Sequence, residues 1–180
     1  VDTIRYTIGS GCMVQKVVTV QSSPVPITGV MSICLGQSTV LSSGPGGFGD
    51  FWTTTAGTGS VTFSVSTTTT TVNATAATGP GTATVTYTGS NGCTRSAVIT
   101  INVLSTPITG PGTVCQGSTI TLANTTGPGT WSSGTTSVAT IGSASGILTG
   151  VAPGTSVITY VFGGCATTVT VTVQPIPSSI

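Results

Sequence analysis

The chain contains an internal repeat whose cysteines stay in register. The segment Pro-Ile-Thr-Gly at 26–29 returns at 107–110, and Cys34 returns as Cys115, both 81 residues later (107 − 26 and 115 − 34). A repeat this long, with frequent turn residues and no helical pattern, is typical of an array of small β-domains rather than of a single enzyme fold.

The repeat also reaches the front of the chain. A tyrosine and a cysteine recur at the matching place in each unit: Tyr6 with Cys12, Tyr87 with Cys93, and Tyr160 with Cys165. Residues 1–22 match only the last part of a unit, with strands expected over 4–8 and 14–20. We therefore expect the front segment to be the C-terminal hairpin of an incomplete unit. Either a longer chain or a neighbouring molecule would supply its missing strands.

Composition excludes several classes of protein. Charged residues make up 3% of the chain, with no His and no Glu, whereas about a quarter is usual. The surface must therefore be solvated by hydroxyl and amide groups. A net charge of +1 provides no basic patch for nucleic acid. Mean hydropathy is positive, at +0.49, but no apolar run approaches the roughly 18 residues of a membrane-spanning helix.

Apolar residues alternate with Thr in many short runs, which predicts half-buried β-strands. Each unit has one tryptophan, Trp52 or Trp131, which follows a loop rich in Gly and Pro and is expected to begin a central strand. We expect both tryptophans, together with Tyr87 and Tyr160, in the core between two sheets. About seven short strands per unit, a central Trp and a cysteine pair predict an all-β fold of tandem immunoglobulin-like sandwiches.

The repeat also sets the expected domain boundaries. Residues 1–22 are the hairpin of the incomplete unit, 23–104 the first immunoglobulin-like domain, 105–174 the second, and 175–180 a linker toward a further unit. Short joints that contain Pro separate these parts. Because Pro stiffens a short joint, we expect a semi-rigid rod.

The second unit carries a set of short segments at 114–119, 130–133, 138–141, 146–155 and 158–165. In these segments it resembles the bacterial Ig-like (Big-type) repeats of very large secreted proteins of Bacteroidota-type bacteria. The first unit departs from this pattern at 63–71, where a run of Thr replaces it. The resemblance implies an extracellular adhesin or surface-fibre stalk, and it carries over no catalytic residues.

The cysteines favour disulfide bonds. A metal site would need closely spaced Cys pairs or His, and a nucleophile would need a base; the sequence offers neither. From their positions within the units, we expect Cys34 to pair with Cys93 and Cys115 with Cys165, leaving Cys12 unpaired within the chain. Each bond would close a loop of 50 to 60 residues (165 − 115 and 93 − 34) and stabilise by roughly 3–4 kcal/mol. Disulfides place the protein outside the cytosol.

Catalysis is not expected. Paired carboxylates are absent, and two distant Asp residues cannot hold calcium. Asp50 stands beside Trp52, which suggests an alternative function as a glycan-binding module with a loop around Trp52 or Trp131. A full burial of both Trp rings favours a structural role, and an exposed Trp beside Asp50 favours the glycan site. If there is no glycan site, we expect Asp50 to be a solvated loop residue that caps a turn.

Three short motifs suggest glycosylation. Asp2-Thr3-Ile4 resembles the O-glycosylation acceptor of Bacteroidota, and Asn73 and Asn124 begin N-type sequons. Taken together, we expect a non-enzymatic structural protein of the cell surface or extracellular space, without cofactor or metal. We expect its partners to be other copies of itself or adjacent repeats in a fibre. Glycans are a second candidate class of partner.

Overall fold

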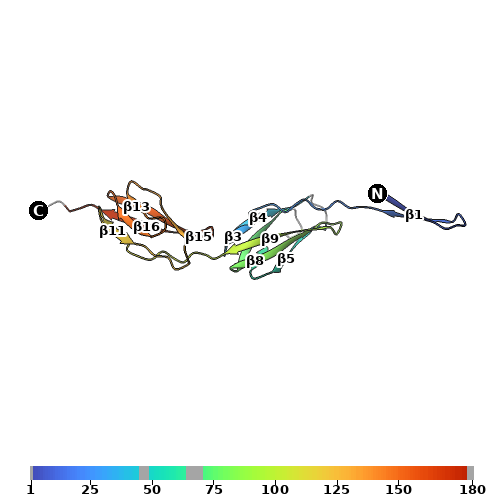
Figure 1. Ribbon diagram of the computed structural model, residues 1–180, viewed down its shortest axis with the longest axis horizontal. Coiled ribbons are helices and arrows are strands. Elements are labelled where there is room, and N and C mark those ends of the chain that lie inside the picture. The colour runs from blue at the N-terminus through green and yellow to red at the C-terminus, as the bar shows by residue number, and fades with distance from the viewer. Residues whose placement is uncertain (1, 45–48, 64–70, 178–180) are drawn as a thin grey trace.

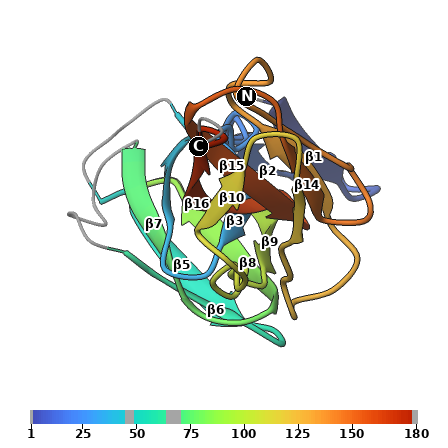
Figure 2. The same cartoon turned by 90° about the vertical axis from the view of Figure 1, so that its left-hand side faces the viewer.

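The computed structural model describes residues 2–44, 49–63 and 71–177, and it is all-β over these residues. A front hairpin and two sandwiches follow one another along the long axis (Figure 1). No helix capable of crossing a membrane occurs in the described ranges. Viewed along that axis, the two sandwiches overlap (Figure 2). The run of Thr at 67–71 lies outside the described residues except for Thr71.

The front hairpin consists of β1 (Asp2–Thr7) and β2 (Met13–Val18). Its register matches that of the hairpin β8–β9 in the first sandwich: Tyr6 lies opposite Val14, as Tyr87 lies opposite Arg95. The strands agree with the expected hairpin to within two residues. The same repeat therefore produces the same hairpin at both places.

The first sandwich contains seven described strands in two sheets. One sheet has the order β3-β9-β8-β5 and the other the order β4-β7-β6. The β3 strand runs parallel to β9, and the other pairs are antiparallel. The bounds are β3 (Ser32–Cys34), β4 (Ser38–Ser42), β5 (Phe51–Ala56), β6 (Ser60–Phe63), β7 (Thr71–Thr78), β8 (Gly81–Thr88) and β9 (Thr94–Asn102).

The second sandwich repeats this topology strand for strand. Its sheets have the orders β10-β16-β15-β12 and β11-β14-β13, and β10 runs parallel to β16. Two facing sheets with this connectivity form an immunoglobulin-like sandwich. The bounds are β10 (Thr113–Cys115), β11 (Thr119–Thr121), β12 (Thr130–Ser133), β13 (Ala139–Ile141), β14 (Ile147–Gly150), β15 (Gly154–Phe162) and β16 (Cys165–Gln174).

Alternation along the strands places the core between the sheets. In β8, the apolar side chains of Ala83, Val85 and Tyr87 are buried, and the intervening Thr residues point outward. Successive side chains of a strand point to opposite faces, so each Thr-apolar alternation yields one buried face and one hydroxyl-bearing face. In β8, apolar residues therefore lie in the core and Thr residues on the outer face.

The repeated Pro-Ile-Thr-Gly segment has the same structure in both sandwiches. Thr28 forms a β-bridge with Ser42, and Thr109 forms one with Ala123. The following Gly29 and Gly110 have φ angles of 137° and 132°, a region that L side chains rarely adopt. A Cβ atom at Gly29 would also lie 2.5 Å from the Val40 carbonyl oxygen. Gly is required at this turn for both reasons.

Hydroxyl pairs cover the outer faces of the sheets in place of ion pairs. Ser38 lies opposite Thr75, and their hydroxyl oxygens are 2.7 Å apart. The hydroxyls of Thr86 and Ser96, also directly opposite, are 2.9 Å apart. Cross-strand pairs of this kind stabilise a sheet by roughly 0.2–1 kcal/mol each. The Ser and Thr content thus replaces the missing charges.

Candidate functional site

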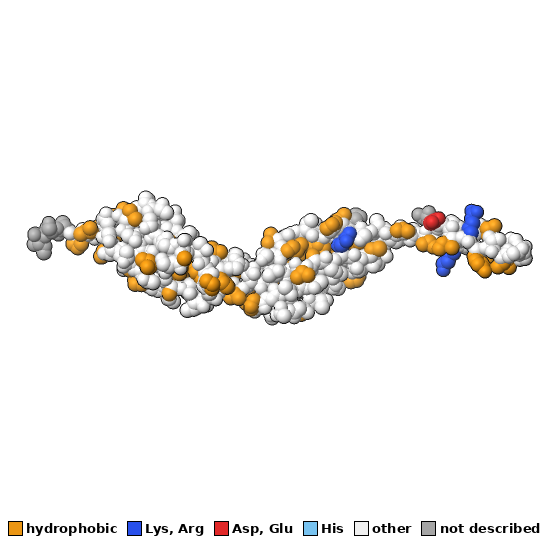
Figure 3. Space-filling view, in the orientation of Figure 1, with side chains coloured by type: hydrophobic (Ala, Val, Ile, Leu, Met, Phe, Trp, Pro, Cys, Tyr) orange, Lys and Arg blue, Asp and Glu red, His pale blue; other side chains and the backbone are white. Residues whose placement is uncertain are grey.

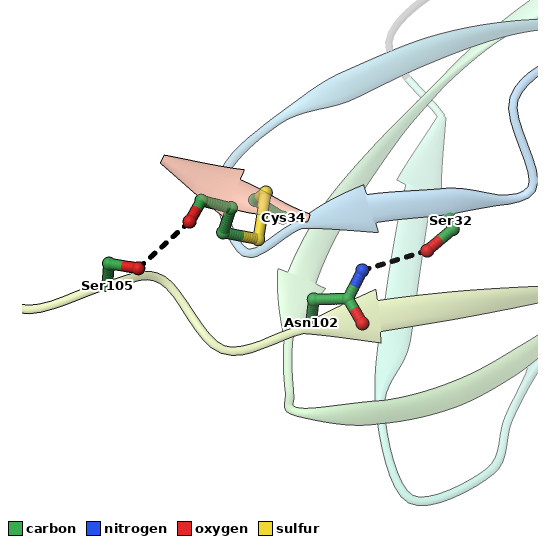
Figure 4. The surroundings of a disulfide bond; sticks show 5 residues. Ser32, Cys34, Asn102 and Ser105 are labelled. Carbon is green, nitrogen blue, oxygen red and sulfur yellow. Dashed lines mark hydrogen bonds between the residues drawn. A yellow bond between two sulfur atoms is a disulfide. The ribbon is translucent and has the colours of Figure 1, made fainter. Parts of the chain in front are cut away.

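The junction between the two sandwiches is closed by a disulfide bond. It joins Cys34 and Cys165, which are 131 residues apart in sequence, with a Cα–Cα distance of 5.8 Å. Cys34 is the last residue of β3, and Cys165 is the first residue of β16. The bond therefore ties the far end of one sandwich to the near end of the next (Figure 4).

The predicted pairing of Cys34 with Cys93 and of Cys115 with Cys165 is wrong. Because β3 runs parallel to β9, Cys34 lies opposite Asn102, at the end of β9 remote from Cys93. The nine residues from 93 to 102 span about 30 Å of strand, whereas a disulfide needs Cα atoms within about 7 Å. The same separation in β16, from Cys165 to Gln174 opposite Cys115, excludes the second pairing.

Polar contacts surround the disulfide at the junction. The buried Ser105 hydroxyl donates a 3.0 Å hydrogen bond to the Cys165 carbonyl oxygen, and the Asn102 side-chain amide donates a 2.8 Å bond to Ser32 Oγ (Figure 4). A Cβ atom placed on Gly163 would lie 3.9 Å from Asn102 Cβ. The hairpin tip of the second sandwich therefore lies against the end of β9.

The remaining three cysteines form no disulfide bond in the described chain. Cys12 and Cys115 are exposed, and Cys93 is half-buried; all three are free thiols. Cys12 lies at the tip of the front hairpin, Cys93 at the tip between β8 and β9, and Cys115 at the end of β10. The expectation that Cys12 has no partner within the chain agrees with this placement.

The joint before each sandwich lies against the hairpin tip of that sandwich. In the first sandwich, the Asn91 side-chain amide donates a 2.9 Å bond to the Ser22 carbonyl, and Arg95 Nε donates a 3.2 Å bond to the Pro24 carbonyl. In the second, Ser105 makes the corresponding contact with Cys165. The hairpin tips are therefore the near ends of both sandwiches, where a preceding unit adjoins.

Both tryptophans are buried between the sheets. The exposed fraction is 3% for Trp52 and 6% for Trp131. Trp52 lies directly opposite Tyr87, with ring centroids 5.1 Å apart, and Trp131 lies opposite Tyr160, at 4.7 Å. Aromatic pairs at these distances stabilise a core by about 0.5–1.5 kcal/mol beyond area burial. Neither ring presents an open face for stacking on a sugar.

Asp50 differs from the solvated loop residue that the sequence predicts. It is 1% exposed. Its Oδ2 accepts a 2.5 Å bond from the Tyr87 hydroxyl, and its Oδ1 accepts a 2.6 Å bond from the Ser90 backbone N–H. Burial, and secondarily the hydrogen bond and negative charge of Asp50, raise the pKa of Tyr87 to about 12. Asp50 thus ties the loop at 89–92 to the core.

The second sandwich has a surface hollow of about 390 Å³ beside Trp131 and Tyr160. Asn124 lines it, but this side chain is held in place, because its amide nitrogen donates a 2.6 Å bond to the Thr106 carbonyl and its oxygen accepts a 2.9 Å bond from Thr126 N–H. N-glycosylation of Asn124 would replace one of the two hydrogens on the amide nitrogen that makes the first of these bonds. Asn73 is half-buried in β7, and Thr3 is exposed in β1.

No grouping of three or more metal-binding side chains occurs among the residues that the structure describes.

The junction with its Cys34–Cys165 bond, rather than a pocket, is the candidate functional site in the described chain. Sequence reasoning missed it because the repeat gives the positions of the cysteines but not the end of the sandwich on which each one lies. The parallel pairing of the first and last strands in an immunoglobulin-like unit is the signal that could have revealed it.

The chain matches no protein-family model and no curated protein. It is similar to a solved C-terminal 282-residue fragment of intimin, in complex with the intimin-binding domain of the translocated intimin receptor: 20% identity, TM-score 0.53, covering 84% of this chain and 64% of that one. It is also similar to invasin, a bacterial integrin-binding protein: 16% identity, TM-score 0.55, covering 91% and 42%. The chain spans less than two thirds of either structure. At these identities, the likeness shows the immunoglobulin-like fold.

Proposed function

We propose that the chain is a non-enzymatic segment of an extracellular bacterial surface filament or adhesin stalk. In it, immunoglobulin-like units of the Big type are joined end to end and resist tension. The observation that carries this proposal is the Cys34–Cys165 bond between successive sandwiches. A disulfide in this position belongs to an oxidising compartment and gives the rod a second covalent connection across its joint.

The position of the disulfide determines which residues bear a pulling force. Tension applied to the two ends of the chain passes through β3 to Cys34, crosses the sulfur–sulfur bond to Cys165, and leaves through β16. The residues between the two cysteines form a closed loop that cannot be extended while the bond is intact. Most of the core of both sandwiches, including Trp52 and Trp131, lies in that loop, whereas the core residues Ile33, Val171 and Val173 lie on β3 and β16. The bond therefore prevents extension of the loop and leaves β3 and β16 to bear the tension.

The front hairpin supports the serial arrangement. Ile4 and Tyr6 are 62% and 69% exposed, while Val85 and Tyr87, at the matching places of β8, are fully buried. Side chains that form a core in the complete unit thus lie open on the hairpin, where orange patches are visible in Figure 3. An isolated two-stranded hairpin is marginally stable in water. We infer that the remaining strands of another immunoglobulin-like unit cover this face.

The alternative function, glycan binding, has less support. Stacking on a sugar requires an accessible aromatic face, and both Trp rings are buried. Asp50, the polar group that would have oriented a sugar, is occupied by Tyr87 and Ser90. The surface chemistry instead favours a solvated spacer, since its exposed hydroxyls are paired along the sheets.

Single-molecule pulling on the oxidised chain, held at its two ends, tests the proposal. With the disulfide intact, we expect no release of the 131-residue segment. After reduction, or in a Cys34→Ser/Cys165→Ser double variant, two unfolding events should together release up to about 450 Å, at roughly 3.3–3.6 Å per residue. The single Cys115→Ser variant is the matched control and should behave like the parent. Release of the 131-residue segment in the oxidised parent would contradict the proposal.

A further inference from the structure

The turn that follows Cys34 is repeated after Cys115, bond for bond. The Cys34 carbonyl accepts a 2.9 Å hydrogen bond from Gln37 N–H, and the Cys115 carbonyl accepts one of 3.0 Å from Ser118 N–H. Gly36 and Gly117, within the two turns, both have a φ of 80°. Cys115 is thus held in the backbone geometry that presents Cys34 to its partner.

The two cysteines also lie at the same end of their sandwiches. Cys34 is opposite Asn102, the last residue of β9, and Cys115 is opposite Gln174, the last residue of β16. These are the points at which the chain leaves each sandwich. Cys34 faces the following unit from this end, and Cys115 is exposed at the corresponding end of the second sandwich.

Cys93 has the complementary position. It lies at the hairpin tip of the first sandwich, as Cys165 does in the second, and the preceding joint is bound there by Asn91 and Arg95. The backbone of this turn matches that of the front hairpin: Gly89 N–H donates to the Cys93 carbonyl at 2.9 Å, and Ile8 N–H donates to the Cys12 carbonyl at 3.0 Å. Cys93 therefore stands where a preceding unit would end.

We propose that Cys34–Cys165 is one link of a disulfide series that runs along the array. In this series, Cys115 bonds to the hairpin-tip cysteine of the next immunoglobulin-like unit, and Cys93 bonds to the cysteine that ends the first strand of the preceding unit. The inference rests on the serial array proposed above. Each bond forms when two thiols lose two protons and two electrons to a disulfide oxidant, which is reduced to two thiols.

The placement of each disulfide between two units, rather than within one unit, has a mechanical consequence. Each bond joins a unit to its successor, so successive disulfide loops overlap: Cys93 and Cys115 both lie within the loop closed by Cys34 and Cys165. Bonds within single units, as the sequence alone suggests, would leave every joint dependent on a single backbone. The series between units gives every joint two covalent connections instead.

An extended chain tests the proposal directly. Residues 103–180 are repeated after Gln174, which supplies a further unit through the joint that connects the two existing sandwiches. The added copy carries Thr113→Ser and Thr167→Ser, so that both its Cys115 peptide and its Cys165 peptide differ in mass from the originals. The protein is oxidised with glutathione disulfide, its free thiols are alkylated, and it is digested with pepsin at low pH to prevent disulfide exchange.

We expect Cys115 of the original unit to be linked to the mass-marked Cys165 peptide and to lose its alkylation. The Cys34 bond to the unmarked Cys165 is the internal control for folding. Complete alkylation of the original Cys115, with the control bond intact, would overturn the proposal, as would a bond from Cys115 to the unmarked peptide. The pulling experiment on the parent chain would be unaffected by these failures, so the array and the disulfide series are tested separately.

Discussion

Tyr87 and Asp50 form a buried hydrogen bond of 2.5 Å in the first sandwich. At the matching place in the second sandwich, the Tyr160 hydroxyl donates to the backbone carbonyl of Gly127. Both tyrosines pack on the central Trp of their sandwich. The framework is therefore shared, but only the first sandwich has a carboxylate as the acceptor.

This difference predicts a dependence of stability on pH in the first sandwich. The pKa of Tyr87 is about 12 in the folded protein, against 10.0 for an ordinary tyrosine. Unfolding therefore releases a proton between these values, so the stabilisation is fully present below pH 10 and is lost as pH rises toward 12. Chemical denaturation at a series of pH values, with Trp52 fluorescence as the signal in a Trp131→Phe background, measures this loss.

Substitution of Tyr87 by Phe provides the control. It removes one donor to the buried Asp50, which should cost about 1–3 kcal/mol, as an incompletely satisfied buried group does. It should also remove the contribution of Tyr87 to the fall in stability above pH 10. Tyr160→Phe is the matched change in the second sandwich, where the acceptor is neutral, and should cost about 0.5–1.5 kcal/mol. An unaltered pH profile in Tyr87→Phe would exclude Tyr87 as its source.

Removal of a buried tryptophan should unfold its sandwich. Trp131→Ala is expected to cost roughly 3–5 kcal/mol, as large-to-small changes in a core do, and it should lower the thermal stability of the second sandwich. Val157, in β15 of the same sandwich, is 47% exposed, so the nearly isosteric Val157→Thr is a surface control that should change stability by about 0.5 kcal/mol or less. A folded Trp131→Ala protein with weakened glycan binding would instead favour the binding module.

Completion of the front hairpin should stabilise it. Residues 24–83, attached ahead of Thr3, supply the strands that precede β8 and replace Asp2 by Ala83, because Thr3 is equivalent to Thr84 in the repeat. We expect the hairpin face that contains Ile4 and Tyr6 to become buried. Amide hydrogen exchange of β1 and β2 should then slow to the rate of β8 and β9.

A charged variant separates this effect from simple lengthening of the chain. Ile4→Asp places a carboxylate on the face that the added strands would cover, so it should abolish the slow exchange in the completed protein. Thr3→Asp, on the opposite face of β1, is the matched control and should preserve it. Fast exchange in the completed parent would show that the hairpin is not the end of such a unit.

The sequence predicted the sandwiches from two signals with clear physical causes. Thr-apolar alternation determines which face of a strand is buried, and the repeat locates equivalent strands such as those that contain Trp52 and Trp131. The bonding of Cys34 was not predictable from spacing alone, because spacing does not reveal that β3 runs parallel to β9. The burial of Asp50 was missed for a related reason: its partner Tyr87 is 37 residues away in sequence.

Mapping of the disulfide in the parent chain tests the central claim most directly. The oxidised protein is alkylated without reduction, digested with pepsin and analysed by mass spectrometry. We expect a peptide pair that links Cys34 to Cys165, with Cys12, Cys93 and Cys115 alkylated. A link between Cys34 and Cys93, or between Cys115 and Cys165, would place the bonds within single sandwiches and contradict the joined rod.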